Sequence, residues 1–101
     1  MQSSQTILNQ NDAENLAIEA LVFLAQQPDL LSRFLSLTGI EASSIREAAQ
    51  EPAFLTGVLQ FYLAHEPTLM QFSKASGHKP ESLGKALHFL PGGNNFYEQS
   101  T

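Results

Sequence analysis

The sequence predicts a single all-α domain of about six helices, on three observations. No stretch alternates between apolar and polar residues with a period of two, so no strand is expected. Prolines and glycines recur at intervals typical of helix starts and helix ends, respectively. The chain has 101 residues, of which 43% are hydrophobic. A domain of this size buries roughly two-thirds of the surface that its unfolded chain exposes, which is enough for one core.

Helices are predicted at residues 12–26, 28–38, 41–50, 52–65, 67–76 and 80–90. Asp12 is a good N-cap for the first helix, because its carboxylate can accept hydrogen bonds from free backbone N–H groups. Four of the later helices are predicted to begin at a proline. Proline is tolerated at the first helical position, because the N–H that it lacks would be unpaired there anyway. These prolines are Pro28, Pro52, Pro67 and Pro80. Gly39 and Gly77 stand where helices should end, since glycine adopts the left-handed C-terminal conformation without steric cost.

Neither end of the chain is expected to join the core. Residues 1–11 are polar, have no charged side chain before Asp12 and show no helical period, so they are predicted to be a disordered arm. Pro-Gly-Gly stops the last helix and begins a flexible tail over residues 91–101, which leaves 12–90 as the helical domain. Ordering ten residues costs roughly 10–20 kcal/mol of backbone entropy, whereas burying Ile7 and Leu8 returns only about 3–6 kcal/mol.

The chain also contains a weak internal repeat at an offset of 38 residues. Its identical pairs are Leu21/Leu59, Phe23/Phe61, Leu31/Leu69, Phe34/Phe72, Gly39/Gly77, Ser44/Ser82 and Ala48/Ala86. They predict two related three-helix units, residues 12–50 and 52–88, closed against each other around a pseudo-twofold axis, because open arrays need three or more copies. The core is expected to contain Phe23, Phe34, Phe61 and Phe72. Gly57, inside the fourth helix, marks either the close approach of another helix or simple tolerance of a weak helix former.

Three stretches carry a resemblance to a known family. They are FLSLTG at 34–39, EPAFLTGVLQFYL at 51–63 and the HE-x-x-LM run at 65–70. Over about residues 12–92, and including Leu-Pro-Gly-Gly at 90–93, the chain resembles a family of small alphaproteobacterial proteins that is known only as a domain of unknown function. The resemblance implies a cytoplasmic, all-helical bacterial protein. It implies no activity, cofactor or catalytic residue.

Composition argues against several classes of function. There is no cysteine, which removes disulfide frameworks, thiolate zinc sites, iron–sulfur clusters and cysteine nucleophiles. The formal charge of −5 argues against general polyanion binding. The apolar stretch at 16–25 is about half as long as a bilayer span and contains Glu19. A secretory signal requires basic residues before its apolar core, and the first basic residue of this chain is Arg33. We therefore expect a cytoplasmic protein with no membrane partner.

No catalytic, cofactor-binding or metal-binding residue is predicted, and the chain is interpreted as a non-enzyme. A metal site would require convergence of four side chains, His65, Glu66, His78 and His88. The three histidines are separated by 13 and 10 residues, spacings that match no helical face or zinc finger. We interpret His88 as an ordinary histidine at the edge of the core. The serines lack the glycine context of a nucleophile elbow, and Gly92–Gly93 precede the tail instead of a helix, so they form no phosphate loop. No small-molecule ligand is inferred.

Nucleic-acid binding is the less favoured of two remaining functions. Residues 33–49 have the shape of a helix-turn-helix, and their repeat mate 71–87 lies in the more basic part of the chain. The net charge is +1 over residues 67–101 and −6 over residues 1–66. However, the candidate recognition helices offer few side chains for base edges or phosphates.

Protein–protein interaction is the favoured function, with an unidentified protein partner or by self-association. Ile18 and Val22 lie on the side of the first helix opposite Leu16 and Ala20. Exposed apolar patches on small proteins tend to be contact surfaces. The alternative is that the first and fourth helices bury these residues against each other.

Overall fold

The computed structural model describes residues 7–92. The elements in order are α1 (Gln10–Ala25), α2 (Pro28–Thr38), a 3₁₀ turn η1 (Ala42–Ser44), α3 (Ile45–Ala48), α4 (Pro52–Leu63), α5 (Glu66–Ser76) and α6 (Pro80–His88). Within residues 7–92 there are six α-helices and no strand, which confirms the predicted fold class. Five of the predicted helices match observed ones to within two residues at each end. The predicted helix 41–50 is instead a 3₁₀ turn followed by a single α-helical turn.

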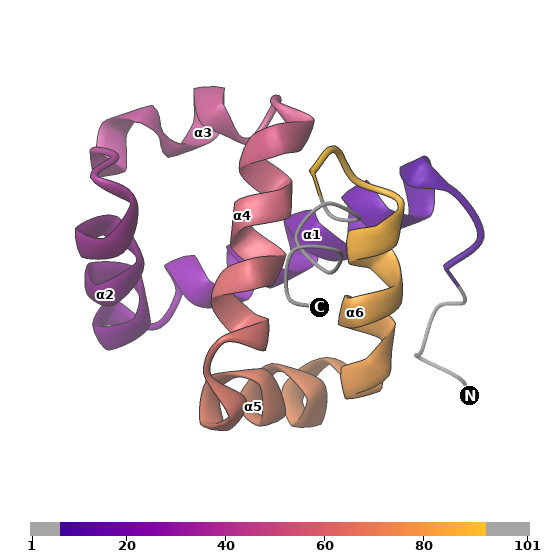
Figure 1. The fold of residues 1–101 in the computed structure, drawn as a ribbon. Helices are drawn as coiled ribbons and strands as arrows, with labels where there is room; N and C mark the ends of the chain where they lie inside the picture. The colour runs from indigo at the N-terminus through magenta and orange to yellow at the C-terminus, as the bar shows by residue number, and fades with distance from the viewer. Residues whose placement is uncertain (1–6, 93–101) are drawn as a thin grey trace.

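Helix α1 is the centre of the fold. It packs against both α4 and α6, which lie side by side (Figure 1). Its buried residues recur at spacings of three and four, as one face of a helix requires, and they are Ala13, Leu16, Ala17, Ala20, Leu21 and Leu24. Helix α4 contributes Leu55, Thr56, Val58, Leu59, Phe61 and Tyr62, and α6 contributes Leu83, Ala86 and Leu87. The core therefore forms where these three helices meet.

Helices α2 and α5 flank this centre in a similar way. Helix α2 packs against α1, and α5 packs against α4. Each inserts one phenylalanine, Phe34 or Phe72, that is only 1% exposed. Each also ends at a glycine in the left-handed region, Gly39 at φ 75° and Gly77 at φ 85°, whose N–H donates to the carbonyl four residues earlier at 2.9 Å. The two predicted glycine helix stops are thus confirmed.

The third elements of the two predicted units differ. Helix α6 has nine residues and buries three of them, whereas η1 and α3 bury none. The four phenylalanines of the repeat also differ in burial, because Phe23 is only half-buried while the other three lie in the core. The pseudo-repeat therefore stays a prediction. Superposing residues 12–50 on residues 52–88 would test it.

Gly57 is not a point of close helix contact. A Cβ placed on it would meet no atom within 4 Å apart from its chain neighbours and the backbone of its own helix. Tolerance of a weak helix former therefore accounts for this glycine. Because glycine costs about 1 kcal/mol relative to alanine inside a helix, we expect Gly57→Ala to raise the free energy of unfolding by up to about that amount. Urea denaturation measures the change, and a loss of stability would show that the site has a packing constraint.

The start of the first helix differs from the predicted one. Asn9, and not Asp12, is the N-cap: its side-chain oxygen accepts from the N–H of Asp12 at 2.8 Å. The carboxylate of Asp12 in turn accepts from the N–H of Leu8 at 3.0 Å. Ile7 lies in the core at 2% exposure. The prediction of a disordered arm over residues 1–11 is therefore wrong for residues 7–11, and residues 1–6 lie outside the described part.

Ordering this segment costs less entropy than ordering ten residues would. Only residues 7–9 must be ordered outside a helix, at a cost of roughly 3–6 kcal/mol. Burial of Ile7 returns about 1.5–3 kcal/mol, the Asn9 cap about 1 kcal/mol, and the hydrogen bond to Leu8 about 1 kcal/mol. At the other end, Leu90 is buried and the Thr56 hydroxyl donates to the Pro91 carbonyl at 2.7 Å. Residues 93–101 of the predicted tail lie outside the described part.

Ile7→Ala tests whether the segment before α1 belongs to the core. We expect a loss of about 2 kcal/mol in unfolding free energy, because a buried aliphatic side chain is removed. For a domain of this size, that lowers the melting temperature by about 10 °C. Leu8→Ala is the control, since Leu8 is 69% exposed and should change stability by less than about 0.5 kcal/mol. Equal effects of the two substitutions would place Ile7 outside the core.

Tyr62 joins α4 to α1 by a buried hydrogen bond. Its hydroxyl donates to the carbonyl oxygen of Ala20 at 2.7 Å, and the side chain is fully buried. Burial raises the pKa of Tyr62 well above its ordinary value. Above about pH 10 the unfolded chain therefore loses this proton while the folded chain keeps it, so that stability falls as the pH rises.

This linkage predicts a difference between the wild type and Tyr62→Phe at high pH. From about pH 10 upwards, the wild type should lose about 1.4 kcal/mol of unfolding free energy per pH unit more than the variant does. Urea denaturation at pH 9 and pH 11 measures the difference. The other groups that titrate in this range, the lysines and Tyr97, are present in both proteins and cancel in the comparison. Parallel pH profiles would show that Tyr62 ionises equally easily in the folded and unfolded chains.

Candidate interaction surface

The side of α1 that faces away from α4 and α6 carries two exposed apolar side chains. Ile18 is 42% exposed and Val22 is 51% exposed. They stand one helical turn apart and together form what we call the ridge. The alternative that α1 and α4 bury them against each other is therefore wrong. The other exposed large apolar residues in the described part line neither of the hollows beside the ridge, namely Leu8, Leu37, Met70 and Phe89.

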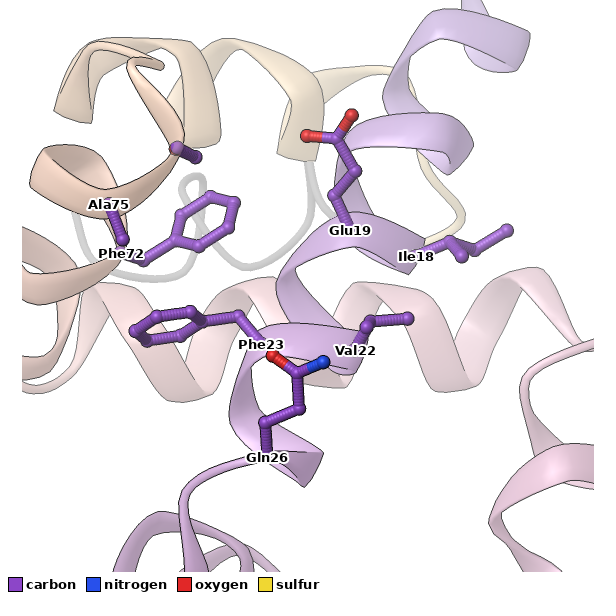
Figure 2. Close-up of a pocket in the computed structure, with 8 residues that line it drawn as sticks. Ile18, Glu19, Val22, Phe23, Gln26, Phe72 and Ala75 are labelled. Carbon is purple, nitrogen blue, oxygen red and sulfur yellow. The ribbon is translucent and has the colours of Figure 1, made fainter.

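A shallow hollow lies on the α5 side of the ridge (Figure 2). It has a volume of about 330 Å³ and is open to solvent. Phe23 and Phe72, whose rings meet edge to face with centroids 5.6 Å apart, form its apolar wall. Ala75 and Ser76 of α5 and Gln26, directly after α1, complete the lining with the ridge and Glu19. This α5-side hollow is mostly apolar, and Glu19 is the charged residue of its lining.

A buried histidine holds Glu19 in place. The Nε2 of His78 lies 2.6 Å from Oε1 of Glu19, so that the ring N–H donates to the carboxylate. His78 is 3% exposed, whereas the side chain of Glu19 is 54% exposed. The imidazole stacks on Phe72 at a centroid distance of 6.0 Å. The contact ties the turn before α6 to α1 and fixes a carboxylate at the rim of the α5-side hollow.

A larger hollow lies on the opposite side of the ridge, between α1, α2 and α3. Its volume is about 700 Å³. The lining is largely apolar and comprises Ile18, Leu21, Val22, Ala25, Leu31, Ala42, Ser43, Ile45, Arg46 and Ala49. Arg46 is the charged residue of this α3-side hollow. The ridge therefore stands between two apolar hollows, one with a carboxylate and the other with a guanidinium.

The three histidines considered at the sequence level lie in different parts of the fold. His65 is the N-cap of α5, and its Nδ1 lies 2.7 Å from the Thr68 hydroxyl. His88 is exposed on α6, so its interpretation as a core-edge residue is wrong. Ser73 and Ser76 do lie beside His78, but their hydroxyls bond to its backbone carbonyl and N–H, not to its ring. Within residues 7–92, no three His, Asp or Glu side chains are grouped as a metal site would need.

The helix-turn-helix hypothesis meets a geometric difficulty in its first copy. The segment expected to be a recognition helix is the four-residue α3, which is too short to present several side chains to a DNA groove. In the second copy, α6 turns Leu83, Ala86 and Leu87 into the core. Its exposed residues include both acidic Glu81 and basic Lys85. Neither helix presents a basic face.

Comparison with known proteins identifies a family. Residues 10–93 match the family described as a protein of unknown function (DUF3572). The chain belongs to this family. The match confirms the predicted membership of an uncharacterised family. It covers every helix of this DUF3572 protein, from α1 to α6. Comparisons with curated proteins and with solved structures found no match. In the described part of the chain, no helix has the length and apolarity to cross a bilayer.

The sequence identified the ridge but not its surroundings. The helical period of α1 placed Ile18 and Val22 opposite the core face. The two hollows depend on how α2, α3 and α5 pack beside α1, and the Glu19–His78 contact joins residues 59 positions apart. No local pattern in the sequence signals such a contact. The position of His78 between a helix-ending glycine and a helix-starting proline indicates only that it lies in a tight turn.

Proposed function

We propose that this chain is a non-enzymatic cytoplasmic interaction domain that binds another polypeptide through the ridge and its two hollows. The exposure of Ile18 and Val22, one turn apart on the central helix, is the observation that supports it. Single exposed apolar residues are normal on a protein surface, whereas contiguous apolar patches mark contact sites. Here the ridge and the linings of both hollows are contiguous.

The size of the ridge indicates how a partner must bind. Burying the exposed parts of Ile18 and Val22 returns about 2–3 kcal/mol. Association costs at least about 4 kcal/mol of translational and rotational freedom. The ridge alone is therefore too small, and a partner must also fill at least one hollow with apolar side chains. A polypeptide can do both, whereas a nucleic-acid backbone would meet a single guanidinium, Arg46, on this surface.

Photo-crosslinking tests this proposal. A photoreactive amino acid is placed at Val22 or, as the control, at Leu37, which is 68% exposed on α2 and lines neither hollow. In a lysate of the native host, or with the purified chain alone, we expect the Val22 probe to yield a discrete crosslinked polypeptide and the Leu37 probe to yield none. Equal labelling by both probes, or none from Val22, would contradict the proposal. Duplex DNA binding that falls steeply with salt would support the helix-turn-helix alternative.

A further inference from the structure

We infer that the polypeptide bound by this surface is a second copy of the chain, and that the ridge of each copy enters the α3-side hollow of the other. The inference rests on the proposed function and specifies its partner. Most homo-oligomers are twofold dimers in which the same patch of both copies meets. Such a patch must carry both a protruding part and a hollow that receives it. The ridge and the α3-side hollow share Ile18 and Val22 and so lie directly beside each other.

The relative size of the hollows favours the α3 side as the receiving one. It encloses about 700 Å³, compared with about 330 Å³ on the α5 side. Its lining includes the apolar side chains of Leu21, Leu31 and Ile45, together with four alanine or serine residues that leave room for inserted groups. Two β-branched side chains one turn apart can enter such a space without rearrangement of the backbone.

The geometry fixes the direction of the twofold axis. If the axis runs nearly parallel to α1, between the ridge and the α3-side hollow, rotation places each ridge over the hollow of the other copy. The two α1 helices then run parallel. If the axis runs across α1, rotation places ridge against ridge and leaves the hollows unfilled. Only the first arrangement buries both the ridge and the hollow.

Charge complementarity supports the same arrangement. Glu19 lies on the α5 side of the ridge, and Arg46 lines the α3-side hollow. When the ridge of the second copy enters that hollow, Glu19 of the second copy comes to the side where Arg46 lies. The symmetry forms this pair twice. Because His78 fixes one oxygen of a carboxylate that is still half-exposed, Glu19 is held ready for a second contact. Ridge against ridge across α1 would instead bring the two Glu19 carboxylates together.

The position of Glu14 limits how long the contact between the helices can be. It lies one turn before Ile18 on the same side of α1, so the two copies of Glu14 would repel if the helices stayed in contact there. We therefore expect α1 and its copy to lie closest together beside Ile18 and Val22 and to diverge towards Glu14, with the axis inclined slightly to α1.

The oligomeric state tests the inference first. Analytical ultracentrifugation should show a reversible monomer–dimer equilibrium as the concentration of the full chain rises to about 1 mM. At that concentration even a dimer with a Kd of about 1 mM is populated. Val22→Asp should raise the dimer Kd at least about tenfold because it places a charge at the centre of the interface. Leu37→Asp, on α2, should leave the Kd unchanged. A chain that is monomeric throughout would overturn the inference.

Cysteine pairs test the arrangement, because the chain has no cysteine of its own. Val22→Cys and Ser43→Cys place single thiols on the ridge and in the α3-side hollow. On oxidation, a mixture of the two variants should form Val22–Ser43 disulfides between copies in preference to either homodisulfide. A mixture of Leu37→Cys with Ser43→Cys should show only background coupling. Preferential Val22–Val22 coupling would mean that ridge meets ridge, which contradicts the proposed axis.

Charge reversal tests the Glu19–Arg46 pairing. Arg46→Glu should weaken the dimer about threefold to tenfold, since each lost pair is exposed at the rim and is replaced by like charges. Lys85→Glu makes the same charge change on α6 and should have no effect. Equal effects of the two variants would refute the pairing. If the chain stays monomeric but the Val22 probe captures another polypeptide, only the self-association is wrong. If Val22 captures nothing, the proposed function fails as well.

Discussion

Phe34→Ala should lower the free energy of unfolding by about 3–5 kcal/mol. Phe34 is the residue that α2 buries in the core, at 1% exposure. Its ring meets those of Phe54 and Phe61 edge to face, with centroids 5.8 Å and 5.3 Å away. Alanine would leave a cavity beside two aromatic rings and remove the main anchor of α2. Since small domains are stable by only about 5–15 kcal/mol, the loss is a large fraction of the total.

Urea denaturation of Phe34→Ala and Leu37→Ala provides the comparison. Leu37 lies on the same helix, but it is 68% exposed. Its replacement by alanine should change the free energy of unfolding by less than about 0.5 kcal/mol. A loss below about 1.5 kcal/mol for Phe34→Ala would contradict the account, because it would mean that α2 is anchored by other contacts.

Much of the fold could be predicted because its signals are local. Proline near a helix start and glycine at a helix end act within one turn of chain, so Pro28, Pro52 and Gly77 mark boundaries that the structure reproduces. The core face of α1 follows from spacings of three and four residues. The expected helix at 41–50 is shorter than predicted, and its apolar residues Ile45 and Ala49 are only partly buried against the core.

Features that depend on distant parts of the chain could not be predicted. Ile7 has no helical period around it, and its burial depends on a surface that the folded helices create. The Glu19–His78 contact and the hollows beside the ridge arise only when α5 and α6 return to α1. The sequence could show that Ile18 and Val22 face away from the core. It could not decide whether another helix covers them, because that depends on the path of the chain.

Helix α1 has one face in the core and, as we propose, the opposite face on a binding surface. Two aspartate substitutions on this helix separate the faces. Leu16 is fully buried, so Leu16→Asp places a carboxylate in the core without a partner, which should remove most or all of the domain's stability. Val22→Asp places the same group on the ridge, where water can solvate it. The two variants share the same change in charge and lie on the same helix.

The most direct test is to measure the thermal unfolding and the sedimentation of Leu16→Asp and Val22→Asp side by side with the wild type. We expect Leu16→Asp to be unfolded or to melt far below the wild type. Val22→Asp should melt within a few degrees of the wild-type monomer and lose association. If Val22→Asp unfolds as Leu16→Asp does, Val22 belongs to the core and α1 has no free binding face. If it folds and associates as the wild type does, the ridge is not the contact surface.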